Sequence, residues 1–176
     1  MAGQRLTDKT VLAENPSAAD LLMVVDVSDT TGSAAGTSKQ IRNKHIIQTD
    51  KVSISAAEID LLTSPVTLVA TPGAGFFIQP ITITCFVTWV SSGTSQSNYL
   101  YISYDSSSTI NYIISQRNFY QNEVASRSYV FGAATASTDG TYAGLIADKP
   151  LKIYSNVDYT GDFTIDVYTT YQIVNV

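Results

Sequence analysis

Two stretches of this chain alternate between apolar and polar residues with a period of two, and this alternation constrains the fold more than any other feature. In residues 81–89, ITITCFVTW, one face would carry Ile81, Ile83, Cys85, Val87 and Trp89. Residues 162–173, DFTIDVYTTYQI, would likewise gather Phe163, Ile165, Val167, Tyr171 and Ile173 on one face. A period of two matches a β-strand with one buried face and one face in water. We therefore expect antiparallel strands that are half buried.

Less regular apolar runs extend this prediction along the second half of the chain. They lie at residues 99–104, 110–115, 129–134 and 151–154, and turn-rich segments such as VSSGTSQSN separate them. Six to eight short strands at this spacing are typical of an all-β sandwich. The predicted class is mainly β: an antiparallel β-sandwich, jelly-roll-like, preceded by an extended N-terminal attachment region with a short helix.

The composition changes near Pro65. Residues 1–65 contain no Phe, Trp or Tyr, whereas all eleven tyrosines lie between Tyr99 and Tyr171. A change of this kind indicates a domain boundary. We predict an attachment or adaptor region over residues 1–50, a short helix and linker over 51–65, and the β-sandwich over 66–176.

The first 65 residues carry their own local signals. Leu21–Val27 predicts a strand, Ser38–Ile41 a possible partner strand, and the Ser-, Thr- and Gly-rich residues between them a loop. Ser55 followed by Glu58 three residues later is a capping box, which predicts a short helix from about Ala56 to Leu62, ended before Pro65.

Groups for catalysis or metal binding are few. The chain has one histidine, His45, and one cysteine, Cys85, which excludes a zinc site and an intrachain disulfide. We interpret Cys85 as a core residue, His45 as a solvated or interface residue, and the TPGAGFF segment around Gly73 and Gly75 as a tight turn rather than a phosphate loop. No cofactor and no metal are expected.

Three carboxylates near the C-terminus, Asp158, Asp162 and Asp166, could supply the pair that glycoside hydrolysis needs. Asp162 and Asp166 share a strand face, but four residues of strand separate them by roughly 13 Å. A solvated strand face is the better interpretation, and we expect no enzyme.

Charge and hydropathy exclude further classes of partner. The net charge of −5 argues against binding to phosphate backbones. No apolar run reaches the length of a membrane span, and the N-terminus lacks the apolar core of a signal peptide. We expect neither nucleic acid nor a membrane as a partner, and we expect synthesis and folding in the cytoplasm without secretion.

The tyrosines leave two alternatives open. They either pack into the core and subunit interfaces, where an aromatic ring with a polar tip suits a half-wet surface, or form a stacking platform for sugars. The candidate glycan-facing residues are Tyr99, Tyr101 and Tyr112.

Two segments resemble structural proteins of tailed bacteriophages. Residues 19–41, ADLLMVVDVSDTTGSAAGTSKQI, are similar to a segment near the N-termini of phage fibre and appendage proteins. Residues 54–80, ISAAEIDLLTSPVTLVATPGAGFFIQP, resemble another recurrent phage segment, in which a short helix leads into a β-domain. The chain lacks the repetitive shaft of a long tail fibre, so a head fibre, a capsid decoration protein or a compact tail-tip knob fits its length.

The resemblance implies a non-enzymatic structural protein located in the virion, with phage capsid or tail proteins as partners. The alternatives are a receptor- or glycan-binding knob of a tail fibre, which would contact host-surface glycans, and a carbohydrate-cleaving appendage. The resemblance, together with the excess of large apolar residues, predicts a homotrimer. The candidate residues for virion attachment and trimer contacts are Leu21, Leu22, Val24, Ile41, Ile46 and Ile47.

Overall fold

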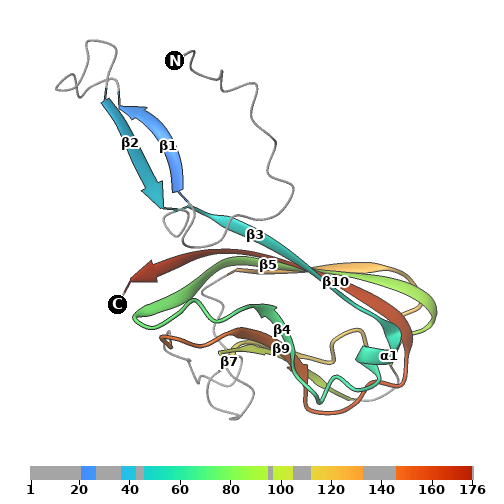
Figure 1. Ribbon diagram of the computed structural model, residues 1–176. Coiled ribbons are helices and arrows are strands. Elements are labelled where there is room, and N and C mark those ends of the chain that lie inside the picture. Colours follow the sequence, from blue (N-terminus) through green and yellow to red (C-terminus); the bar gives the residue numbers. More distant parts are fainter. Residues whose placement is uncertain are drawn as a thin grey trace. The chain divides into compact units, whose positions relative to one another are not determined.

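The computed structural model divides the chain into two compact units, residues 1–45 and 46–176, which are described separately (Figure 1). The described residues are 21–26, 37–42, 46–94, 97–104, 112–132 and 146–175.

The described part of the first unit is a β-hairpin. Strand β1 (Leu21–Asp26) pairs antiparallel with β2 (Thr37–Arg42), so that Leu21 lies opposite Arg42 and Asp26 opposite Thr37. Both predicted strands and their pairing are confirmed. The predicted loop between them lies outside the described residues.

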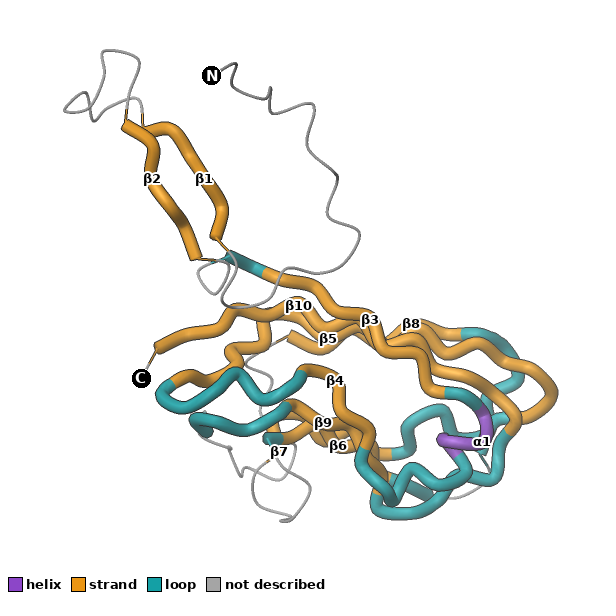
Figure 2. Tube along the Cα trace, viewed as in Figure 1, coloured by secondary structure: helices purple, strands orange, loops and turns teal. Residues whose placement is uncertain are grey.

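The described part of the second unit contains two four-stranded sheets that pack as layers (Figure 2). The first, here called the long sheet, has the order β3 (Gln48–Ile54), β10 (Asp162–Asn175), β5 (Phe76–Ser92), β8 (Arg127–Gly132). The second, the short sheet, has the order β4 (Val66–Val69), β9 (Leu151–Ser155), β6 (Tyr99–Ser103), β7 (Tyr112–Arg117). All neighbouring strands are antiparallel.

The strand pairs of these sheets are nested. The first strand of the unit pairs with the last (β3 with β10), the second with the seventh (β4 with β9), the third with the sixth (β5 with β8), and the middle two with each other. A long hairpin whose two arms roll up together gives this order, which is that of a jelly roll. The predicted β-sandwich with jelly-roll character is therefore confirmed.

The sandwich includes more of the chain than residues 66–176. Strand β3 is an edge strand of the long sheet, with Ile54 opposite Ile165 of β10. Ile59 in the short helix that follows, and Leu62 in the turn after that helix, are both completely buried. The change in composition near Pro65 therefore falls inside the second unit, whose boundary lies between His45 and Ile46.

Helix α1 (Ala56–Ile59) begins with the predicted capping box. The Ser55 amide donates to the Glu58 carboxylate at 2.8 Å, and the Ser55 hydroxyl accepts from the Glu58 amide at 3.4 Å. The helix is shorter than predicted: it ends at Ile59, and turns follow it instead of a helix that reaches Leu62. The carbonyls of Ile59 and Leu62 accept from the amides of Tyr159 and Ser155 in the C-terminal third of the chain. Where the helix ends early, these backbone hydrogen bonds connect the chain to the C-terminal part of the sandwich.

Alternation holds along the whole of β10, where the five apolar residues predicted to share a face are all buried, namely Phe163, Ile165, Val167, Tyr171 and Ile173. It holds on β5 for Ile83, Cys85 and Val87 but not for Ile81, which is 37% exposed. The register shifts there, since Thr170 pairs with Thr82 and the next residue, Tyr171, with Pro80. This β-bulge leaves Ile81 without a place on the inner face, so the prediction for Ile81 was wrong.

The TPGAGFF segment is a tight turn, as predicted. Gly73 and Gly75 have φ angles of +99° and +80°, which favour glycine, and the Phe76 amide donates to the Gly73 carbonyl at 3.2 Å. The turn directs the chain into β5.

Among the residues that the structure describes, four tyrosines are buried in the sandwich, namely Tyr104, Tyr120, Tyr159 and Tyr171. The hydroxyls of Tyr104 and Tyr120 donate to the carbonyls of Ile78 and Ala125. The Tyr159 hydroxyl donates to the side chain of Asn98, and the Tyr171 hydroxyl bonds to the side chains of Gln48 and Asp50. Burial raises the pKa of all four phenols. These tyrosines fit the first alternative, an aromatic core with satisfied polar tips.

Candidate functional site

Three tyrosines form a row on the outer face of the short sheet. Tyr99 and Tyr101 alternate with the fully buried Leu100 on β6, and Tyr154 of β9 lies directly opposite Tyr101. The rings of Tyr99 and Tyr101 are stacked, with 5.9 Å between centroids and an interplanar angle of 6°. Tyr101 and Tyr154 are 5.2 Å apart and tilted by 33°. Two of the three predicted glycan-facing residues therefore lie together, joined by Tyr154.

This stacking limits how the row can bind a ligand. A sugar ring that packs on an aromatic residue needs an accessible ring face. The rings of Tyr99 and Tyr101 turn a face toward each other, so recognition by the row would rely more on ring edges and hydroxyl groups. The backbone of Tyr112 lies in β7 opposite Ser103. Its side chain lies outside the described residues.

Two cations accompany the tyrosine row. Arg117 of β7 lies opposite Tyr99, and Lys152 of β9 lies opposite Ser103, two residues beyond Tyr101. Among the described residues at outward positions of the four short-sheet strands, the charged ones are Arg117 and Lys152. Both are positively charged. This surface, with phenols and two cations, suits hydroxyl-rich or anionic partners.

A second cluster lies on the outer face of the long sheet. Phe86 of β5 and Tyr168 of β10 meet edge to face, with centroids 5.7 Å apart. Val130 of β8 lies opposite Thr84, which in turn lies opposite Tyr168. Phe86 and Val130 are 50% and 67% exposed. We call Thr84, Phe86, Val130 and Tyr168 the long-sheet cluster.

The long-sheet cluster was not among the predicted sites. The signal was present in ITITCFVTW, where Phe86 is the apolar residue on the face otherwise formed by Thr82, Thr84 and Thr88. An aromatic residue on the polar face of an alternating strand lies on an exposed surface if the strand has the predicted register.

A polar pair borders the long-sheet cluster. Lys51 Nζ lies 2.8 Å from Asp166 Oδ2 and 5.6 Å from the centroid of the Tyr168 ring. The Ser53 hydroxyl donates to the other Asp166 oxygen at 2.6 Å. The hydrogen bond from Lys51 is the main reason that the pKa of Asp166 is lowered, with a further contribution from Ser53.

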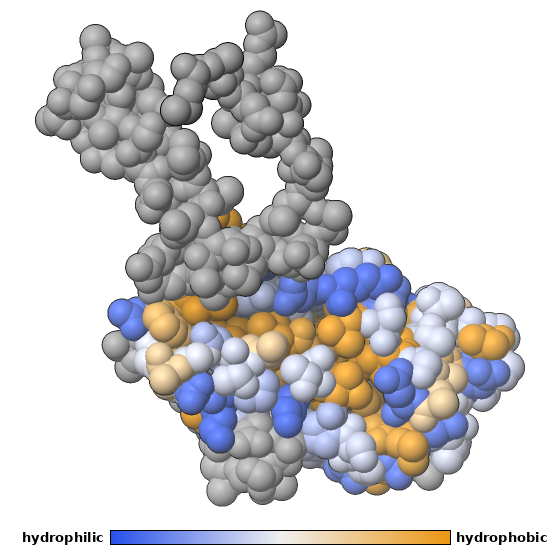
Figure 3. Space-filling view, in the orientation of Figure 1, coloured by the Kyte–Doolittle hydropathy of each residue, from blue (hydrophilic) through white to orange (hydrophobic). Residues whose placement is uncertain are grey.

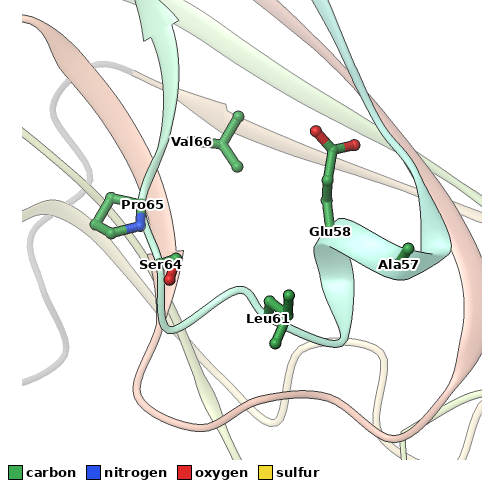
Figure 4. Close-up of a pocket in the computed structure, with 6 residues that line it drawn as sticks. All are labelled: Ala57, Glu58, Leu61, Ser64, Pro65 and Val66. Carbon is green, nitrogen blue, oxygen red and sulfur yellow. The ribbon is translucent and has the colours of Figure 1, made fainter.

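A hollow of about 410 Å³ lies between α1 and the start of β4 (Figure 4). Its lining residues are Ala57, Glu58, Leu61, Ser64, Pro65 and Val66. Leu61 and Val66 border it, while the Glu58 carboxylate points away from Leu61 and is held in the capping box (Figure 4). Apolar surface gathers toward this end of the sandwich (Figure 3). The hollow can accept an apolar side chain, but it brings together no catalytic groups.

The three carboxylates considered for glycoside hydrolysis each bind hydroxyl groups. Asp158 accepts from Thr63, Asp162 from Ser91, and Asp166 from Ser53. Asp162 and Asp166 lie at outward positions of β10, as the strand pattern predicted. In the part of the chain that the structure describes, no group of three His, Cys, Asp or Glu side chains is placed to hold a metal ion.

Cys85 is buried, as predicted, and burial raises the pKa of its thiol to about 12. His45 lies outside the described residues. The cysteine is therefore a core residue without thiolate character near neutral pH.

The residues predicted for virion attachment fall into two groups. Leu21, Leu22 and Val24 lie on β1 and Ile41 on β2, where the structure describes only the backbone. Ile46 and Ile47 begin the second unit, directly before β3, and Ile47 is 60% exposed. The contacts proposed for these residues stay a prediction.

No model of a known protein family matches this chain, and no curated protein matches its sequence. Among solved structures, the chain is similar to one described as "Cyanophage Pam1 capsid asymmetric unit", with a TM-score of 0.38 and 12% identity over 97% of this chain and 98% of that one. None of the helices in the described segments is long and apolar enough to cross a membrane.

Proposed function

We propose that this chain is a non-enzymatic structural protein of a bacteriophage particle, of the head-fibre or capsid-decoration type. Its N-terminal region docks on capsid or tail proteins, and its jelly-roll sandwich projects from the virion. The observation that carries this proposal is that the resemblance over residues 19–41 and the β-hairpin fall on the same part of the chain. The segment that resembles phage appendage proteins contains β1 and all of β2 except Arg42, in a unit separate from the sandwich.

The same hairpin suggests how docking works. A two-stranded hairpin is marginally stable by itself in water and has two edges that can pair with further strands. Pairing through backbone groups gives affinity without special side-chain chemistry. Three copies of the chain would supply three such hairpins around one attachment point, which is the homotrimer that the resemblance implies.

The proposal is tested by incorporation into particles. Phage lacking this protein would be grown in cells that supply either the full chain or residues 46–176, and purified virions would be examined by gold labelling and mass spectrometry. We expect the full chain on virions and the shorter chain in the soluble fraction. Virions that contain neither chain would overturn the proposal.

A second candidate function is a receptor-binding knob, and the tyrosine row favours it. Tyr99, Tyr101 and Tyr154 with Arg117 and Lys152 form a surface rich in hydrogen-bond donors on an otherwise acidic protein. Binding of purified protein to host polysaccharide, lost in Tyr101→Ala, would support this function. Turnover of that polysaccharide, abolished by Asp166→Asn, would instead support the carbohydrate-cleaving alternative.

A further inference from the structure

The long-sheet cluster is an apolar patch on the outer face of the long sheet. Phe86, Tyr168 and Val130 come from three adjacent strands and surround Thr84. The remaining outward positions nearby are mostly small hydroxyl residues, including Ser53 and Ser128 on either side of the Phe86 row and Thr49, Thr170 and Thr82 in the row beyond Thr84. Exposed apolar clusters with a polar border are typical of protein interfaces.

The outer face of the long sheet carries few charges. Among the described outward residues of the long sheet, charge is carried by Lys51 and Asp166, which neutralise each other, and by Asp162 near the end of β10. Asp162 accepts a hydrogen bond from Ser91 there. The central rows therefore carry no net charge, although the whole chain carries −5.

The short sheet differs in this respect. Its outward cations, Arg117 and Lys152, have no acidic residue among the described outward positions of the same sheet. Around a three-fold axis every charge occurs three times, so a face with two unmatched cations would bring six like charges together. Like charges opposed across an interface are unfavourable. The two faces are thus not equally suited to pack against further copies of the chain.

We infer that the outer face of the long sheet, centred on the long-sheet cluster, is the surface through which the sandwich packs against a second copy of this chain. The inference rests on the homotrimer in the proposed function and assigns it contacts outside the N-terminal hairpin. Phe86 and Val130 become buried in the trimer. The tyrosine row of the short sheet then faces away from the other copies.

The mass of the full-length protein tests this inference. Val130→Lys and Thr84→Lys each place a charge in the cluster, and Thr67→Lys places the same charge at an exposed outward position of the short sheet. By light scattering at micromolar concentration we expect a trimer for wild type and Thr67→Lys, and a mass about one third of that for the two cluster variants. Circular dichroism checks that all four proteins are folded.

Cross-linking gives a second measurement that needs no disruptive charge. Val130→Cys and Thr67→Cys would be treated with a bifunctional maleimide, while Cys85 stays unreactive because it is buried. Covalent dimers are expected for Val130→Cys only. The inference is overturned if the charged cluster variants keep the wild-type mass, if Val130→Cys cross-links no better than Thr67→Cys, or if the wild-type protein is a monomer. Incorporation into virions is measured separately, so failure of the proposed function remains distinguishable.

Discussion

Asp158, in the loop before β10, accepts hydrogen bonds from both the backbone amide and the hydroxyl of Thr63, at 3.0 and 2.5 Å. The two residues are 95 positions apart in the chain. Their contact ties the turn after α1 to the start of the last strand, and thereby joins the N-terminal and C-terminal ends of the sandwich.

The first prediction concerns the pH dependence of this contact. Hydrogen bonds from Thr63 lower the pKa of Asp158 below its ordinary value of 3.8. A lowered pKa means that the stabilisation is complete above about pH 4 and is lost as the pH falls through the folded-state pKa. Asp158→Asn should therefore lower the melting temperature at pH 7 and have a smaller effect at pH 2. Equal effects at both pH values would show that the charged form is not what Thr63 binds.

The second prediction concerns the start of α1. Ser55→Ala removes the hydroxyl that accepts from the Glu58 amide, which should lower the free energy of unfolding by about 1 kcal/mol. Urea denaturation measures this change. The control is Ser64→Ala, at an exposed serine five residues after α1, which should change stability by less than half as much. A Ser55→Ala protein as stable as the control would contradict the role of the capping box.

The third prediction concerns Cys85, whose thiol is fully buried and has its pKa raised by burial to about 12. Labelling by a thiol reagent at pH 8 should be very slow in the folded protein and fast in denaturant, because the thiolate is the reactive form. Val130→Cys supplies an exposed thiol for comparison. Labelling of native Cys85 as fast as that of Val130→Cys would show that this part of the core opens readily.

Much of the fold follows from local sequence rules. Alternation located β10 and most of β5, and the Ser55 and Glu58 pair located the start of α1. Ile81 was misplaced because a bulge shifts the pairing of β5 with β10 by one residue, and nothing within the strand itself reveals the partner's register. The long-sheet cluster was missed for a related reason, because Phe86 and Val130 become neighbours only through β5–β8 pairing.

The change in amino-acid composition near Pro65 does not mark the boundary between the two units, which lies at residues 45 and 46. Residues 46–65 lack aromatic side chains, yet they supply an edge strand and three buried aliphatic residues to an aromatic sandwich. A jelly roll pairs its first strand with its last, so the first strand can differ in composition from the strands that it contacts.

The last prediction tests this boundary with two shortened chains. Residues 46–176 retain all eight sandwich strands, so this chain should fold and melt cooperatively. Residues 66–176 lack β3 and lose Ile54, Ile59 and Leu62, which are each at most 1% exposed. Removing one buried aliphatic side chain costs about 2–5 kcal/mol, and three such losses approach the whole stability of a domain, which is about 5–15 kcal/mol. The removal of β3 also exposes one edge of β10 along seven paired residues. We therefore expect the shorter chain to be unfolded or aggregated by circular dichroism and size-exclusion chromatography. A folded, soluble chain of residues 66–176 would show that β3 and α1 are additions to a sandwich that is stable without them.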